Sequence, residues 1–171
     1  MSTQPVFHAR PSIVATEVPR EDHLRLLPCL FGPDMLRFER FICFWSERLC
    51  PHCGDSDWRL IGLSNGGCYM APDAHSVHVQ VERNGFDAIV SADGAGIIVS
   101  LYALELLAES VCNERVPSLY EHLREFAVRH PESSAIHEAI SACPPLARAL
   151  RRQPALLAAV ETLRRKLCRR F

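Results

Sequence analysis

Cys50 and Cys53 frame the sequence Cys-Pro-His-Cys, whose side chains are the ones best suited to chemistry in this chain. Two cysteines at this spacing can cycle between a dithiol and a disulfide, or they can supply two of the four ligands of a zinc ion. In disulfide oxidoreductases the first cysteine begins a helix directly after a strand, whereas here the pattern places the motif after a helix and before a strand. A zinc site would need two more ligands, for which Cys43, Cys68 and His75 are the candidates. Thiol chemistry and zinc binding therefore stand as alternatives to the leading hypothesis.

Histidines and a glycine-containing turn offer two further kinds of chemistry. The chain has eight histidines, which act as general bases when a nucleophile or carboxylate lies within hydrogen-bond reach. No sequence-local dyad stands out, and His122 and His137 have charged neighbours, as solvated surface histidines do. Residues 93–96 read Asp-Gly-Ala-Gly at an expected helix start, but they lack the third glycine of a dinucleotide motif and the lysine of a P-loop. An N-cap is the preferred interpretation, and we expect no catalytic residue, cofactor or metal.

Two Asn-Gly pairs predict the β-structure that positions the rest of the chain. Asn65-Gly66 and Asn84-Gly85 each stand between β-prone runs and favour two-residue type I′ turns, in which both central residues have positive φ. Pro72 ends the second run because it has no N–H to donate to a ladder. The four runs, residues 58–63, 68–71, 77–81 and 86–90, predict an antiparallel meander of two hairpins.

Apolar residues at helical spacing predict helices before and after the strands. Residues 37–49 carry an aromatic stripe, residues 95–112 are almost wholly apolar after a Ser91 cap, and residues 119–129 and 134–142 follow. Strands segregated from helices indicate an α+β fold with the meander packed against helices. The aromatic stripe is expected to be core rather than a partner-binding face, and consists of Phe38, Phe41, Ile42, Trp45 and Leu49, with Phe44 beside it.

Composition limits the class of protein. The chain has 171 residues, of which 48% are hydrophobic and 23% charged, which fits one globular domain with a sizeable core. Residues 1–20 contain no long apolar run, so neither a signal peptide nor a membrane span is expected. Eight cysteines in a chain of this size without a secretion signal are expected to be reduced. We expect a cytoplasmic protein that is a monomer or a small homo-oligomer.

Basic and acidic residues are distributed unevenly along the chain. Residues 144–171 hold 8 Lys/Arg against 1 Asp/Glu, whereas residues 1–143 hold 11 against 19. We therefore predict a flexible segment over 1–19, an α+β domain over 20–143, and a basic helical extension over 144–171 that begins at two prolines. The extension either binds nucleic acid through phosphate contacts or packs against the acidic domain. Its candidate contact residues are Arg151, Arg152, Arg164, Arg165, Lys166, Arg169 and Arg170.

Residues 63–73, Leu-Ser-Asn-Gly-Gly-Cys-Tyr-Met-Ala-Pro-Asp, resemble a shared run of the ArdB/KlcA family of antirestriction proteins. Further matching pieces are Leu-Leu-Pro at 26–28, Asn-Gly-Phe at 84–86, Ser-Ala-Asp at 91–93 and His-Pro-Glu at 130–132, so that the resemblance covers about residues 20–143. Two departures stand out. Ser141 occupies a position where the family usually has aspartate, which puts full activity in doubt, and the basic extension has no counterpart in the family.

The resemblance implies a protein of a plasmid or other mobile element that inhibits type I restriction in the host while sparing methylation. It implies binding to a host restriction or other defence protein, directly or indirectly, without catalysis. The domain lacks the dense acidic rows of a DNA mimic. The extension leaves open a nucleic-acid-binding regulator or an inhibitor of a CRISPR-type defence. Within residues 63–73, the candidates for an exposed interaction surface are Ser64, Asn65, Tyr69 and Asp73.

Overall fold

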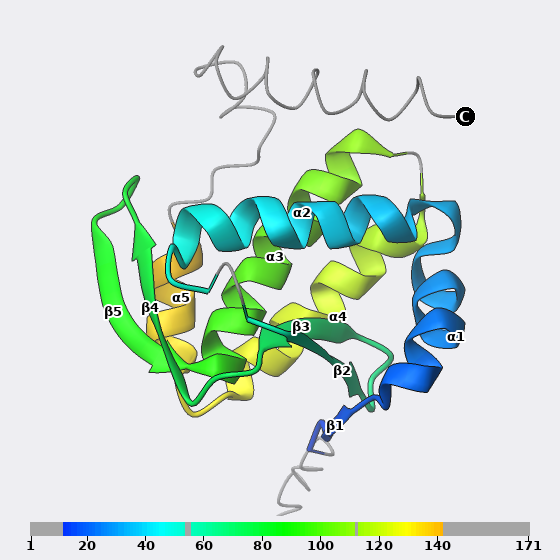
Figure 1. Ribbon diagram of the computed structural model, residues 1–171, viewed down its shortest axis with the longest axis horizontal. Coiled ribbons are helices and arrows are strands. Elements are labelled where there is room, and N and C mark those ends of the chain that lie inside the picture. Colours follow the sequence, from blue (N-terminus) through cyan, green and yellow to red (C-terminus); the bar gives the residue numbers. More distant parts are fainter. Residues whose placement is uncertain (1–11, 54–55, 112, 142–171) are drawn as a thin grey trace, which may run out of the picture.

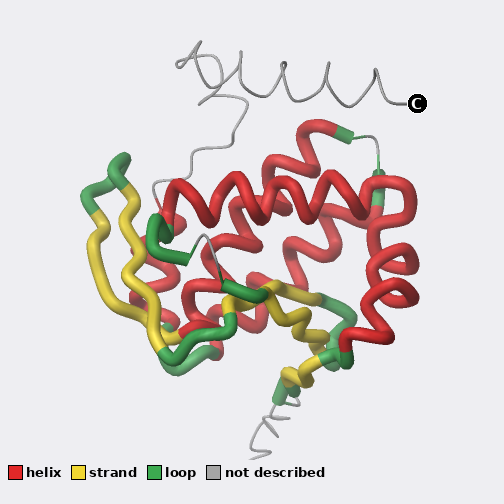
Figure 2. Tube along the Cα trace, viewed as in Figure 1, coloured by secondary structure: helices red, strands yellow, loops and turns green. Residues whose placement is uncertain are grey.

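The computed structural model describes residues 12–53, 56–111 and 113–141. Helices make up most of the described structure, and the strands lie at its left and lower sides in the view of Figure 2. No helix among the described residues has the length and apolar character needed to cross a membrane. The elements in chain order are β1 (Ala15–Glu17), α1 (Arg20–Phe31), η1 (Gly32–Asp34), α2 (Met35–Leu49), β2 (Trp58–Leu63), β3 (Cys68–Pro72), β4 (Ser76–Val81), β5 (Phe86–Ser91), α3 (Ala92–Ser110), α4 (Arg115–Arg129) and α5 (Ser133–Ser141).

Helix α3 is the centre around which the other elements pack. It contacts α2, α4, α5 and β3, and Figure 1 shows it running behind α2 through the middle of the molecule. Most of its residues are buried, as expected for a helix that is apolar all round. Ser91 caps its first turn by accepting a hydrogen bond from the Gly94 N–H at 3.0 Å. The N-cap interpretation of this segment is therefore confirmed.

The strands form two sheets, so the prediction of one four-stranded meander is wrong. A three-stranded sheet has the order β1-β2-β3, and a two-stranded sheet contains β4 and β5, all in antiparallel pairs. The break comes at Pro72, which ends β3 and has no N–H to donate. The Ala74 N–H then turns back onto the Pro72 carbonyl oxygen at 2.9 Å, and β4 leaves for the second sheet.

The predicted type I′ turns are also wrong, although both hairpins pair in antiparallel fashion. Gly66 and Gly85 have φ of 88° and 72°, but no residue other than glycine has a positive φ within the described ranges. Both asparagines instead accept a hydrogen bond from the backbone N–H two residues on, Asn65 from Gly67 at 3.1 Å and Asn84 from Phe86 at 3.0 Å. This local bonding favours wider loops.

The helices predicted within the described residues are present with shifted ends. Helices α2, α3 and α5 begin one to three residues before their predicted starts, and α4 begins at Arg115, before Pro117, which its first turn tolerates. The sequence analysis did not predict β1 or α1. Helix α1 contains Pro28, which removes one backbone donor and hides the helical pattern. The residues of the α2 stripe are all buried, so the prediction that they are core is confirmed.

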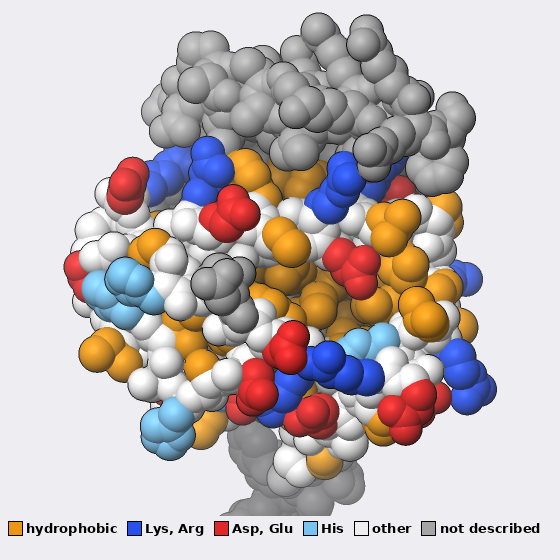
Figure 3. All heavy atoms as spheres, in the orientation of Figure 1, with side chains coloured by type: hydrophobic (Ala, Val, Ile, Leu, Met, Phe, Trp, Pro, Cys, Tyr) orange, Lys and Arg blue, Asp and Glu red, His pale blue; other side chains and the backbone are white. Residues whose placement is uncertain are grey.

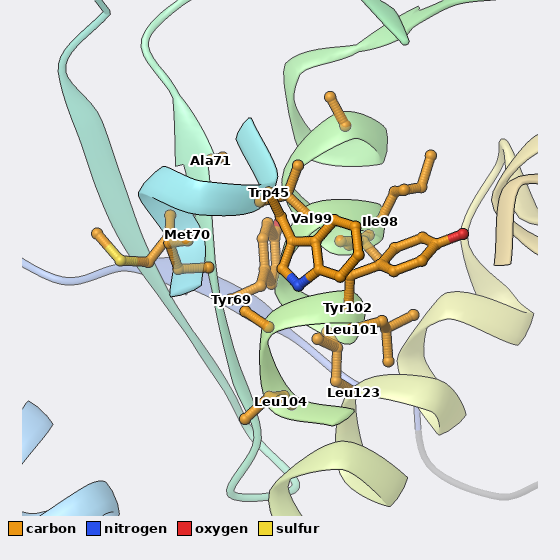
Figure 4. Close-up of a cluster of buried hydrophobic side chains, with 14 of the residues drawn as sticks. Trp45, Tyr69, Met70, Ala71, Ile98, Val99, Leu101, Tyr102, Leu104 and Leu123 are labelled. Carbon is orange, nitrogen blue, oxygen red and sulfur yellow. The ribbon is translucent and has the colours of Figure 1, made fainter. Parts of the chain in front are cut away.

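Aromatic rings join α2 to α3, as Figure 4 shows for Trp45 and Tyr102, whose ring centroids lie 4.8 Å apart. The Tyr102 hydroxyl donates to the Ala139 carbonyl oxygen at 2.9 Å, which attaches α5 to the same helix. On the other side of α3, the buried Ser100 hydroxyl accepts a hydrogen bond from the Met70 N–H at 3.0 Å. This bond satisfies a backbone donor at the edge of β3 that has no strand beside it.

Gly96 is where α3 comes closest to the first sheet. A Cβ atom at this position would lie 2.5 Å from the Met70 carbonyl oxygen and 2.8 Å from the Ala71 Cα. Both are backbone atoms, which cannot move aside as the end of a side chain can. The absence of a side chain at Gly96 therefore sets the distance between α3 and β3, and with it the position of everything that β3 carries.

Candidate functional site

Tyr69 is buried on β3, with 2% of its surface exposed, so the expectation that it is an exposed contact is wrong. Its hydroxyl donates a hydrogen bond to Asp93 Oδ1 at 3.0 Å, and its ring stacks against Phe126 of α4. Burial raises the pKa of the Tyr69 hydroxyl, and the negative charge of Asp93 raises that pKa further. Tyr69 is therefore neutral and links the sheet to the start of α3.

Arg59 of β2 lies among carboxylates that come from distant parts of the chain. Its Nη1 donates to Glu17 Oε2 of β1 at 2.9 Å, and its Nε lies 3.8 Å from Asp73 Oδ1 beyond the end of β3. The hydrogen bond to Glu17 raises the pKa of the guanidinium, with further contributions from Glu17, Asp93 and Asp73. We call Glu17, Arg59, Tyr69, Asp73 and Asp93 the Arg59 cluster.

Ser64 and Asn65 mainly hold the β2–β3 loop in place. Ser64 is exposed, and its hydroxyl accepts a hydrogen bond from the Val14 N–H at 2.9 Å. Asn65 is half-buried, and its Nδ2 donates to the His122 carbonyl oxygen of α4 at 2.9 Å. Of the four predicted contact residues, Asp73 is thus the one with an exposed side chain that makes no short hydrogen bond, although its backbone N–H donates to the Asp57 carbonyl oxygen at 2.7 Å. It lies at the rim of the Arg59 cluster.

Charged side chains gather along one border of an area of hydrophobic side chains that lies between α2 and the first sheet (Figure 3). Among the charged pairs of α1 and the first sheet, Arg20 of α1 pairs with Asp57 at 2.8 Å, and Arg59 of β2 pairs with Glu17 of β1 at 2.9 Å. Arg20, Asp57 and Glu17 are substantially exposed, Arg59 is half-buried, and their charges partly neutralise one another. Such a mixed border suits contact with a polar protein surface better than contact with the uniform negative charge of DNA.

The carboxylate of Glu132 lies at the start of α3. Glu132, just before α5, accepts a hydrogen bond from the Ser91 N–H at 2.9 Å and a second, short one from the Ser91 hydroxyl. A Cβ on Gly94 would lie 2.5 Å from Glu132 Oε2, so the carboxylate fills the space beside this turn. The Ser91 N–H and hydroxyl at the start of this helix are therefore already paired with a carboxylate of the protein itself.

The Cys-x-x-Cys motif follows α2, as predicted, and both of its side chains are buried. Burial raises the pKa of the Cys50 thiol to about 12 and also raises that of Cys53. Cys43 is exposed on α2 and Cys68 is wholly buried on β3. Nowhere in the described part of the chain do three His, Cys, Asp or Glu side chains come together in a manner that could hold a metal ion.

The two candidate histidines differ in their exposure. His137 is exposed, whereas His122 is half-buried against Gly66 and Gly67, with its Nδ1 buried and unpaired. The basic candidates of the C-terminal extension and its predicted helices lie outside the described residues. Sequence reasoning missed Glu17, Arg59 and Glu132, because their partners lie far away along the chain; Asp93 was noted only as part of a helix start.

Comparison with known proteins identifies the family. A family model described as antirestriction protein matches residues 52–141. Antirestriction protein KlcA of Escherichia coli is 43% identical over 136 residues, which are 75% of this chain and 93% of that protein. A second E. coli KlcA is 40% identical over 134 residues, with 75% and 94% covered. Putative antirestriction protein YubI of E. coli K12 is 33% identical over 144 residues, with 78% and 98% covered.

A solved structure agrees with this assignment. It comes from work on KlcA and ArdB that describes a novel fold and antirestriction activity against Type I DNA restriction systems in vivo but not in vitro. The match has a TM-score of 0.68 and 39% identity, and it covers 82% of this chain and 99% of the solved chain. Sequence and structure thus agree with the resemblance seen in residues 63–73, and the chain belongs to the antirestriction protein family of KlcA and ArdB.

Proposed function

We propose that this protein relieves type I restriction of incoming DNA by binding a host component, without catalysis and without affecting methylation. Membership of the antirestriction family carries the proposal, together with the activity described for its structural relative. That relative acts in vivo but not in vitro. Such behaviour is expected of an inhibitor that needs a cellular component besides the purified restriction enzyme, and we extend this expectation to the present protein.

Binding to protein rather than mimicry of DNA is supported by the arrangement of charge. A DNA mimic presents rows of unpaired carboxylates at the spacing of phosphates. Here the carboxylates are interspersed with arginines, as in the pairs Arg20–Asp57, Arg59–Glu17 and Arg129–Glu125. The resulting surface has both signs of charge, which favours a specific polar contact with one protein partner.

We place that contact at the exposed rim of the Arg59 cluster. Asp73 and Glu17 are the exposed carboxylates of the cluster; Glu17 is held by Arg59 at 2.9 Å, whereas Asp73 lies 3.8 Å from Arg59. The buried Tyr69 and the half-buried Asp93 connect this rim to α3. A partner would therefore meet a preorganised polar surface, which lowers the entropic cost of binding.

The test is restriction of unmodified phage or plasmid DNA in a host that carries a type I system. Expression of the protein should raise the efficiency of plating, while methylation of the surviving DNA stays unchanged. The variant Asp73→Ala should lose relief, and Asp87→Ala, which removes an exposed carboxylate from the other sheet, should keep it. Absence of relief by the wild-type protein would refute the function; equal relief by both variants would refute the placement of the contact.

A further inference from the structure

Cys50 and Cys53 lie close together in the turn that connects α2 to the following loop. The Cys53 N–H donates to the Cys50 carbonyl oxygen at 2.9 Å, which closes a four-residue turn over Pro51 and His52. The turn is anchored at its start, because the Cys50 N–H donates to the Ser46 carbonyl oxygen of α2 at 2.8 Å. The backbone therefore holds the two cysteines at the short separation that a disulfide requires.

The two side chains already interact. The Cys50 and Cys53 side chains lie close enough for each to influence the pKa of the other. Their exposed fractions are 0% and 5%, and the side chains belong to the hydrophobic core. Formation of a disulfide between Cys50 and Cys53 therefore needs no large movement of the backbone. Because both side chains are buried, thiols of other proteins have no direct access to the two sulfur atoms.

We propose that Cys50 and Cys53 form an oxidisable dithiol site, which hydrogen peroxide closes into an intramolecular disulfide. This site is independent of the Arg59 cluster and of the proposed antirestriction function. It requires no catalytic cycle: the product is a cross-link that fixes the connection between α2 and β2. The chemistry thus differs from that of a disulfide oxidoreductase, in which an accessible thiolate attacks other proteins.

The order of events follows from the exposure of the two thiols. Cys53 is the more exposed, at 5% against 0% for Cys50, so peroxide reaches the Cys53 sulfur first. The Cys53 thiolate attacks one peroxide oxygen, which gives a sulfenic acid and hydroxide. The Cys50 sulfur then attacks the sulfenic sulfur and expels a second hydroxide as the disulfide forms. The two thiol protons neutralise the two hydroxides, so that two thiols and one peroxide yield one disulfide and two waters.

The sequence makes the test direct. Trypsin cleaves after Arg48 and Arg59, and the peptide 49–59 contains Cys50 and Cys53 without any other cysteine. The full-length protein is treated with hydrogen peroxide, remaining thiols are alkylated under denaturing conditions, and the digest is analysed by mass spectrometry without reduction. We expect this peptide to become about 2 Da lighter than its dithiol form and to carry no alkyl group. Reduction before alkylation should restore two alkyl groups.

Variants assign the roles of the two thiols. In Cys50→Ser, the Cys53 sulfenic acid has no resolving thiol and should be trapped by dimedone. In Cys53→Ser, the mass loss should disappear, and Cys50 should be alkylated. The matched control is Cys43→Ser, which removes an exposed thiol from α2 and should leave the result for the 49–59 peptide unchanged.

Two outcomes would overturn the proposal. One is that the 49–59 peptide still carries two alkyl groups at peroxide doses that fully oxidise Cys43. The tryptic peptide 41–48, which contains Cys43, measures that oxidation in the same digest. The other is a disulfide that joins either cysteine to a different peptide. Both readouts use the wild-type chain and do not depend on antirestriction activity, so failure here is distinguishable from failure of the proposed function.

Discussion

The two hairpins of this protein share an Asn-Gly signal but differ in their surroundings. In the β2–β3 hairpin every residue of β3 is buried, and the hairpin connects to α3, α4 and β1. The β4–β5 ribbon has one exposed face, on which His78 and Gln80 each bond to Asp87 and Ile89 is 74% exposed. The same Asn-Gly pair thus occurs in a hairpin that packs at the centre of the fold and in a ribbon with a solvent-exposed face.

The largest expected effect comes from Gly96→Ala. The new Cβ would meet the backbone of β3 at 2.5 Å, so α3 and the first sheet must separate, which should lower the free energy of unfolding by roughly 3 kcal/mol. The matched change for the second hairpin is Gly85→Ala, where φ is 72° and no atom lies within 4 Å. It should cost only about 1 kcal/mol, from backbone strain alone. Urea unfolding of both variants measures the difference, and equal losses would contradict the close-packing argument.

A smaller effect is expected from Tyr69→Phe, which removes the hydroxyl that bonds to Asp93 and keeps the buried ring. Because the partner carboxylate is left half-buried, the loss should be about 1–2 kcal/mol in chemical denaturation. Relief of restriction should fall less than in Asp73→Ala, since the exposed carboxylate remains. A variant as stable as the wild type would show that the bond does not hold the sheet to α3.

The corresponding change on the ribbon is Gln80→Ala, which removes a bond of 2.9 Å to Asp87 on an exposed face. Here water replaces the lost donor, and we expect the unfolding free energy to stay within about 0.5 kcal/mol of the wild-type value. A loss as large as that of Tyr69→Phe would mean that the two hairpins do not differ in the way described above.

The smallest effect concerns pH. Hydrogen bonds from His78, and then from Gln80, lower the pKa of Asp87 below its ordinary value of 3.8. A carboxyl group with a lowered folded-state pKa contributes stability that is present above the unfolded-state value and is lost as the pH falls through the folded-state value. The contribution should therefore disappear only below about pH 4. An NMR titration should show the pKa of Asp87 rising in His78→Ala, and an unchanged pKa would exclude the bond.

Periodicity predicted the helices that pack by their own apolar residues. The stripe of α2 and the continuous apolar run of α3 both specify helix and burial, so their positions followed from sequence. Helix α1 escaped prediction because Pro28 interrupts its pattern, and β1 because its three exposed residues carry no alternation. Strand β1 exists because β2 offers it a partner, which no local pattern can indicate.

The candidate site was predicted less well than the fold, because it is assembled from distant residues. The sequence distances are 42 residues between Arg59 and Glu17, 24 between Tyr69 and Asp93, and 41 between Ser91 and Glu132. The resemblance in residues 63–73 correctly indicated the family, but it did not distinguish buried from exposed members. Tyr69 proved to be a structural link, whereas Arg59, outside that run, proved to be the hub of the cluster.

The sequence by itself determined the family, the α+β class, the central helix and the position of the Cys-x-x-Cys motif after α2, because each depends on neighbouring residues or on a pattern within one element. Only the tertiary structure decided that the strands divide into two sheets, that Glu132 fills the start of α3, and that Arg59 gathers its carboxylates. These outcomes depend on which distant surfaces meet, and that choice is made by the packing of the whole core around α3.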